Sequence, residues 1–248
     1  MTSLRDQESG HRSRAVGKDG AHDAGWAGVM GNERLTALAG AVLLLLMVVE
    51  LVTVANLRAG LSLHVLLGVL LAGPLAVKLG STSYRFLRYY TRAPAYVRKG
   101  SPRLPLRLLA PLLVATTLVV IGSGIGLVVT GPLRPGPLLL VHGMSTLLWL
   151  PLFAIHTLAY LRRVPRLVAD DWSQASDRRG PQARGLRLGV TLAALLGGAF
   201  AALLVLPVAA PWVTWVTTTG NVPGPFLLLA GLLVTALALL AARLLRWG

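Results

Sequence analysis

The sequence contains no cysteine. This absence excludes disulfide bonds, thiolate metal sites, iron–sulfur clusters and covalent attachment of a c-type haem. Charged residues are also scarce, at 13% of the chain, and only 9 of the 248 residues are acidic. With 54% apolar residues and a mean hydropathy of +0.67, the chain carries more apolar surface than a soluble domain can bury. We therefore expect a lipid bilayer as its solvent.

Apolar stretches divide the chain into regions. About six of them are long enough to cross a bilayer as helices, namely residues 35–57, 61–79, 108–130, 138–161, 188–209 and 226–245. We expect an all-α integral membrane protein whose first four spans form a four-helix bundle, residues 34–163. A basic linker, 164–187, and a C-terminal helix pair, 188–248, would follow. Residues 1–33 mix small, polar and charged residues without an apolar run, which predicts a disordered tail and no cleaved signal peptide.

Basic residues gather in two of the connections between spans. Residues 85–107 hold seven Arg and Lys and no acid, and residues 162–187 hold seven Arg and three Asp. The other connections carry at most one charge each. The positive-inside rule then places both basic loops and both termini in the cytoplasm, with the chain spanning the plasma membrane. Because these charges flank apolar spans, lipid headgroups explain them better than nucleic acid, and we expect no nucleic-acid partner.

Three histidines lie inside the apolar spans: His64, His142 and His156. The last two are fourteen residues apart on one stretch, so on a helix they point within about 40° of each other, roughly 21 Å apart along the axis. The predicted topology places His64 and His142 at one depth in the outer half of the membrane, and His156 near the inner end. Two neutral imidazoles on facing helices at equal depth are the axial pair that a b-type haem needs.

Other readings of these residues stay open. A single histidine in a span is often hydrogen-bonded to a neighbouring helix without binding a ligand. Gly68, one turn from His64, would leave room for a flat macrocycle, but glycine also serves helix contact. Glu50, inside the first span, could accept the Nδ1–H of an outer haem ligand, relay a proton to a quinone, or be protonated or paired with Arg58. We expect Lys78 to extend to the lipid phosphates.

The order and spacing of the histidines resemble the bacterial cytochrome b561 family, which includes the cytochrome b subunits of nickel–iron hydrogenases and formate dehydrogenases. The resemblance covers roughly residues 35–163 and implies a four-helix core with two b haems. It implies that His142 pairs with His64 and that His156 is a ligand of the second haem. The family's partner for this last histidine lies near the inner end of the first helix, where the sequence reads GNERLTALAG. Either one outer haem is held, or the inner one is five-coordinate or uses another ligand.

We expect a membrane b-type cytochrome that carries electrons between a quinone pool or a redox partner subunit and haem b. His64, His142 and His156 would be its ligands, and Arg58 would lie near the propionates at the outer face. No flavin or nucleotide motif is present, which favours an electron-transfer subunit over a stand-alone enzyme. The alternative is a cofactor-free membrane protein, either a transporter or the scaffold of a complex. The sequence leaves a homo-oligomer open.

Overall fold

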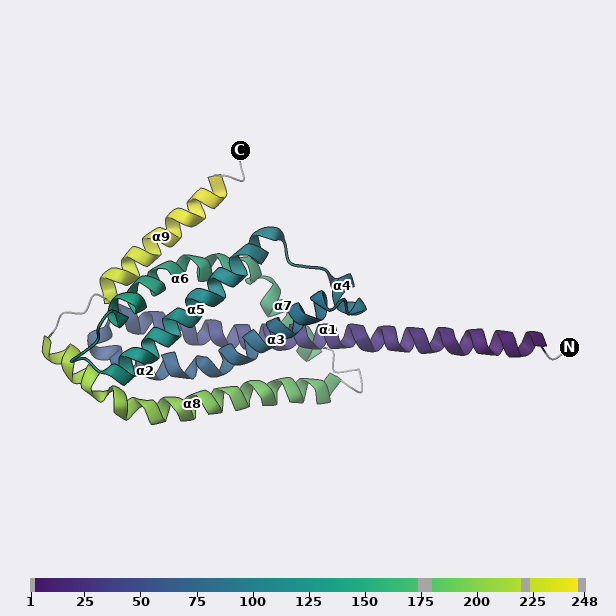
Figure 1. Ribbon diagram of the computed structural model, residues 1–248, viewed down its shortest axis with the longest axis horizontal. Helices are drawn as coiled ribbons and strands as arrows, with labels where there is room; N and C mark the ends of the chain where they lie inside the picture. The colour runs from purple at the N-terminus through teal and green to yellow at the C-terminus, as the bar shows by residue number, and fades with distance from the viewer. Residues whose placement is uncertain (1–2, 174–179, 220–223, 245–248) are drawn as a thin grey trace.

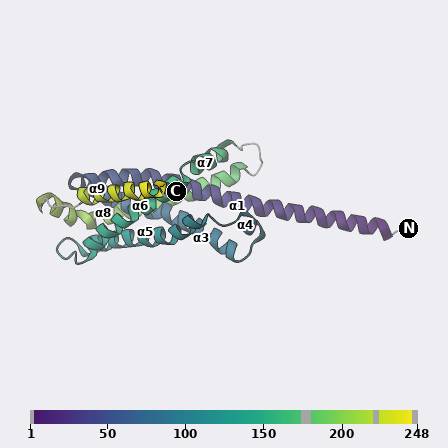
Figure 2. The ribbon, with the colours of Figure 1, turned by 90° about the horizontal axis from the view of Figure 1, so that it is seen from above.

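The structure, a computed structural model, describes residues 3–173, 180–219 and 224–244, and all regular secondary structure in these ranges is α-helical. Most of the long helices run roughly along one direction, and the C-terminal helix is tilted away from them (Figures 1 and 2). In chain order the helices are α1 (Ser3–Ala55), α2 (Leu57–Leu70), α3 (Ala72–Tyr90), α4 (Pro94–Lys99), α5 (Leu104–Thr130), α6 (Leu138–Tyr160), α7 (Arg163–Ser173), α8 (Gly180–Thr219) and α9 (Gly224–Leu244). We call the two ends of the bundle the α4 end, where α4 and α7 lie, and the opposite end.

Five of the described helical segments are long and apolar enough to cross a membrane. They are Gly25–Ala55, Leu57–Tyr90, Leu104–Thr130, Leu138–Tyr160 and Gln182–Thr219. Only 11 to 22% of the most apolar window of each segment is buried, so protein covers few of these apolar side chains. The predicted all-α fold is therefore confirmed for the described residues, and the five long apolar helices are compatible with a membrane protein. The sixth predicted span coincides with an apolar but shorter segment, Gly224–Leu240, and residue 245 lies outside the described part of the chain.

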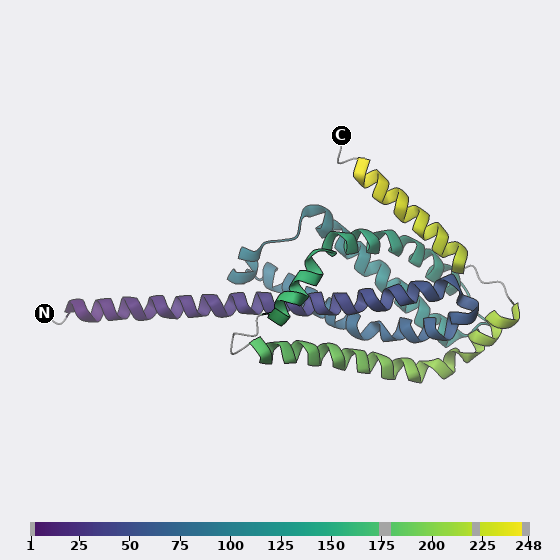
Figure 3. The same ribbon diagram turned by 180° about the vertical axis from the view of Figure 1, so that it is seen from behind.

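The first helix begins much earlier than the first apolar stretch. It runs from Ser3 and projects far beyond the bundle at the α4 end (Figures 1 and 3), where the sequence predicts a disordered tail over residues 1–33. Residues 1–33 contain no proline, so no residue in this segment obliges a helix continuing from the span to stop. Side chains in residues 1–24, His11 and His22 among them, lie outside the described part of the structure.

The second span is broken into α2 and α3 at Leu71 because proline stands at position 74. Pro74 has no backbone N–H, so the carbonyl of Leu70 loses its partner within the helix. At this break α8 approaches through its backbone. A Cβ atom added to Gly198 would lie 2.5 Å from the Leu70 oxygen, and one added to Gly73 would overlap the carbonyl oxygen of Ala194. Two glycines therefore allow α8 to pack closely against the second span.

The last two long helices pack against different parts of the bundle. α8 lies against α2 and α3, whereas α9 lies against α6 and leans away from the bundle at the other side (Figures 1 and 3). Trp212 of α8 is buried, and its Nε1–H donates to the carbonyl oxygen of Leu127 on α5 at 2.7 Å. This contact ties α8 to the far helix of the core at the opposite end. The two helices of the predicted C-terminal pair therefore pack against different helices.

At the α4 end, two acidic residues form ion pairs with the basic connections between spans. Glu33 of α1 is only 6% exposed, and its carboxylate pairs with Arg85 at 3.4 Å, Lys99 at 2.9 Å and Arg163 at 3.0 Å. These three cations come from α3, α4 and α7. A carboxylate this deeply buried needs cationic partners, because without them it would be an uncompensated buried charge. Glu33 therefore fixes the basic loops against the first helix.

A second acid of the same kind stands on α7. Asp171 pairs with Arg34 of α1 at 3.3 Å and with the guanidinium of Arg187 at the start of the fifth span. Both Arg187 and Asp171 are largely shielded from solvent. The linker between the fourth and fifth spans is thus tied to α1 and α8.

The backbone contact at Gly198 gives a direct test of the α8 packing. We expect Gly198→Ala to lower the thermal unfolding temperature in detergent by several degrees, because the added methyl group meets the Leu70 backbone and overpacking costs about 1–3 kcal/mol. Gly197→Ala is the matched control, since a Cβ there meets nothing within 4 Å and alanine favours the helix. Equal unfolding temperatures for the two variants would contradict the close approach of the helices.

Candidate functional site

The structure brings His64 and His142 together inside the bundle. His64 lies in the second turn of α2, and His142 lies in the second turn of α6, both near the opposite end. Their ring centroids are 6.3 Å apart and the ring planes are nearly perpendicular, at 81°. The two imidazoles that the sequence predicts to face each other are therefore neighbours in the structure.

The ring of His64 is held by two groups on α1. Its Nδ1 lies 3.0 Å from Oε1 of Glu50 and 3.2 Å from Oγ1 of Thr53. Glu50 is 7% exposed, and Thr53 donates to its carbonyl oxygen at 2.6 Å. A carboxylate at Nδ1 accepts the N–H from that nitrogen, which turns the lone pair of Nε2 outward. Of the roles predicted for Glu50, the contact with His64 is the one that the structure contains.

The ring of His142 is held in the same manner by α5. Its Nδ1 lies 3.0 Å from the carbonyl oxygen of Val120 and 3.1 Å from Oγ of Ser123. The backbone carbonyl can only accept, so Nδ1 donates to it and Nε2 is again left with its lone pair. Gly124 makes the close approach possible, because a Cβ there would lie 3.2 Å from Cε1 of His142. Both rings thus present Nε2 as the nitrogen that these anchoring bonds leave unused.

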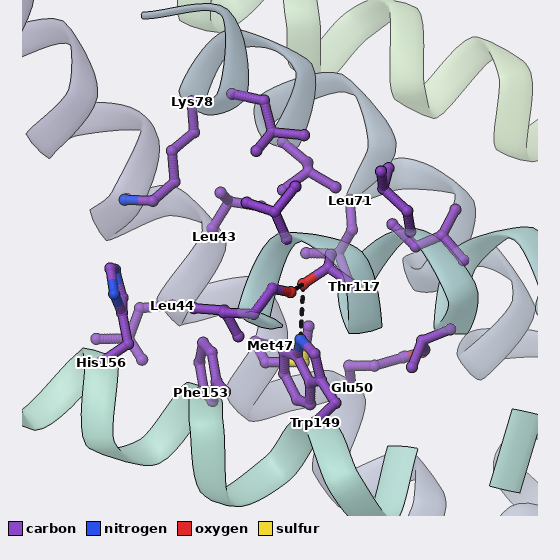
Figure 4. A pocket seen from close by; sticks show the side chains of 18 of the residues that line it. Leu43, Leu44, Met47, Glu50, Leu71, Lys78, Thr117, Trp149, Phe153 and His156 are labelled. Atoms are coloured by element: carbon purple, nitrogen blue, oxygen red, sulfur yellow. Dashed lines mark hydrogen bonds between the residues drawn. The ribbon is translucent and has the colours of Figure 1, made fainter. Parts of the chain in front are cut away.

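A large apolar cavity runs through the bundle beside these rings. Its volume is about 1900 Å³, and residues of α1, α2, α3, α5, α6, α7 and α8 line it. His142, Trp149, Phe153 and His156 all line its α6 wall, which confirms that the two histidines of this helix share one face. Sites for drug-sized ligands measure about 300–1,000 Å³, so this cavity has room for more than one. Figure 4 shows part of it, from Trp149 at one side to His156 at the other.

His156 and Lys78 enter the cavity nearer the α4 end. The His156 ring packs against Tyr160, one turn further along α6, with ring centroids 5.0 Å apart. Lys78 of α3 also lines the cavity, and its side chain points inward (Figure 4). The prediction that Lys78 extends to the lipid phosphates is therefore wrong. Its ammonium approaches Gly40 of α1, where a Cβ would lie 2.8 Å from Nζ.

Two other residues predicted for the site have different places. Gly68 lines the cavity, and a Cβ there would lie 3.5 Å from Oε1 of Glu50, so the glycine leaves room beside the anchored His64. Arg58 lies at the surface instead, and its guanidinium donates to the carbonyl oxygen of Thr217 at 3.1 Å. It therefore caps the last turn of α8 and does not line the cavity.

Sequence reasoning missed the polar groups that form hydrogen bonds within the cavity wall. Trp149 is 6% exposed, donates from Nε1 to Oγ1 of Thr117 on α5 at 2.8 Å, and stacks on Phe153. Trp149, Phe153 and His156 stand 7, 11 and 14 residues after His142, which is one face of a helix, and that spacing could have found them. The Val120 carbonyl that anchors His142 has no sequence signal, because a backbone group is present at every position.

The two anchored imidazoles fit a haem iron better than a bare metal ion. Zinc sites use about three or four protein ligands, and the described residues contain no group of three His, Cys, Asp or Glu placed to hold an ion. A haem iron brings four in-plane nitrogens and takes only axial ligands from the protein. Two imidazoles that would share one iron through Nε2, with bonds of about 2.0–2.1 Å, would have ring centroids roughly 6 Å apart. The centroids of His64 and His142 are 6.3 Å apart.

Comparisons of the chain with protein-family models, curated proteins and solved structures gave no match.

Proposed function

We propose that this chain is a membrane b-type cytochrome that carries electrons between a quinone pool or a redox partner subunit and a haem b held by His64 and His142. The observation that carries the proposal is the pair of facing imidazoles, 6.3 Å apart, each anchored at Nδ1. Haem, when bound, supplies reversible one-electron chemistry. A cofactor-free transporter or scaffold would explain the membrane spans equally well, but it gives no reason for two imidazoles with matched anchors.

The residues around the pair have distinct tasks in this proposal. The Glu50 carboxylate fixes the ring of His64 and increases the electron-donating strength of its Nε2, because it shares the Nδ1 proton. Val120 supplies a neutral carbonyl to His142, which fixes that ring without adding charge. The negative charge of Glu50 would favour the oxidised iron and lower the reduction potential.

The orientation in the membrane follows from the basic residues. We place the α4 end in the cytoplasm, since both basic connections gather there, and the paired histidines near the outer face of the plasma membrane. In this arrangement α9 crosses the bilayer as the sixth span. Its 21 residues measure about 31 Å as a helix, close to the thickness of a hydrocarbon core.

The direct test is a dithionite-reduced minus oxidised absorption spectrum of the purified protein, with the haem quantified as its pyridine complex. We expect a b-type α-band in the native chain, and its reduction or loss in His64→Ala and His142→Ala. His22→Ala is the matched control, a histidine in the polar N-terminal segment, and should leave the spectrum unchanged. A native chain expressed with ample haem that shows no band would contradict the proposal and favour the cofactor-free alternative.

Gly124 offers a second test that leaves both histidines in place. We expect Gly124→Ala to lower the haem content or broaden the low-spin spectrum, because the methyl group meets the His142 ring at 3.2 Å and displaces it. Gly122→Ala adds the same methyl group to the same helix at a position where nothing lies within 4 Å, so haem content should match the native chain. Identical spectra from the two variants would show that α5 does not position His142.

A further inference from the structure

A second pair of nitrogen donors lies in the same cavity, away from His64 and His142. His156 projects from α6, and Lys78 reaches in from α3 (Figure 4). The two side chains come from different helices and face the same apolar space.

The Lys78 side chain points into the cavity because of how α3 packs against α1. The side chain ends against Gly40 of α1, the one residue type that leaves this space open, since a Cβ would lie 2.8 Å from Nζ. Among the residues that the structure describes, no carboxylate forms an ion pair with this ammonium. An ammonium among apolar side chains without a partner is costly. A lysine that served only solubility would extend to the headgroups, as its long stem permits.

We infer that His156 and Lys78 are the axial ligands of a second haem, bound at the α4 side of the cavity. This inference rests on the proposed function. One imidazole and one neutral amine are too few ligands for a bare ion but complete the coordination of a haem iron. The cavity of about 1900 Å³ continues from the first histidine pair to this one.

The end of the cavity beyond Lys78 suits the charged edge of a haem. Arg107 lines it there, together with Tyr90, whose hydroxyl accepts from Arg107. Arg85, which pairs with Glu33 at 3.4 Å, lines it as well. Haem carries two propionate carboxylates, and arginine binds carboxylates well. Along α6 the two sites are separated by roughly 21 Å, so a second centre would extend the electron path from the outer half of the membrane to the cytoplasmic side.

The experiment measures the haem-to-protein ratio, the EPR spectrum and the near-infrared magnetic circular dichroism of the native full-length chain and four variants. We expect about two haems per chain, with one low-spin haem showing the charge-transfer band of imidazole–amine ligation. Lys78→Ala and His156→Ala should each convert this one haem to the high-spin form or remove it. The haem at His64 and His142 should stay low-spin in both.

The remaining two variants separate ligation from charge. Lys78→Arg keeps the positive charge, but a guanidinium stays protonated and offers no lone pair, so we expect it to behave like Lys78→Ala. Lys78→His should restore a low-spin haem, now with two imidazoles. A low-spin second haem in Lys78→Arg would show that Lys78 pairs with a propionate, and would overturn the inference.

A native ratio of one haem per chain that none of the Lys78 variants alters would also overturn the inference, while leaving the proposed function intact. The proposed function itself fails only when the native chain binds no haem, or when His64→Ala and His142→Ala leave every spectrum unchanged. The two failures are therefore distinguishable on the same set of proteins.

Discussion

The site depends on a constraint that a bilayer imposes: a polar group inside it has no water and must find its partner within the protein. Each imidazole of the pair meets this constraint through Nδ1. His64 uses the Glu50 carboxylate, and His142 uses the Val120 carbonyl. Because each ring is held at Nδ1 by a neighbouring helix, Nε2 is the nitrogen that these bonds leave unused. The hydrogen bonds that make burial tolerable are thus the same ones that set the geometry of the pair.

The rest of the fold keeps that space open and fixes its walls. Gly124 lets His142 lie against α5, and Gly40 leaves the space that the Lys78 side chain occupies. At the α4 end, the carboxylate of Glu33 holds three cations from three separate helices, which fixes α3, α4 and α7 around α1. The basic loops are therefore part of the folded bundle as well as a signal of orientation. α8 and α9 add lipid-facing walls to different sides of the core.

Much of this architecture could be predicted from the sequence, because hydropathy and helical periodicity report directly on spans and faces. The five long spans, the shared face of His142 and His156, and the meeting of His64 with His142 all follow from such patterns. The direction of the Lys78 side chain could not be predicted from the sequence, because a lysine near the end of a span can extend either to lipid or inward. The choice depends on the glycine at position 40 of another helix, which is a tertiary contact without a local signal.

The ion pairs that hold the basic loops could also not be predicted from the sequence. Glu33 stands 52 residues before Arg85 and 130 before Arg163, so no local pattern connects them. In the same way, the packing of α8 against the second span depends on Gly73 and Gly198, which meet only in three dimensions. The histidine pair was predictable since topology gives depth, whereas these contacts require the lateral order of the helices.

The most direct test of the central claim, that His64 and His142 hold one iron between them, is the EPR spectrum of the oxidised protein in its His156→Ala form. Two axial imidazoles with ring planes at 81° leave the iron orbitals nearly degenerate, so the account predicts a strongly anisotropic low-spin ferric signal. A high-spin signal alone, or no haem signal from protein expressed with ample haem, would contradict it.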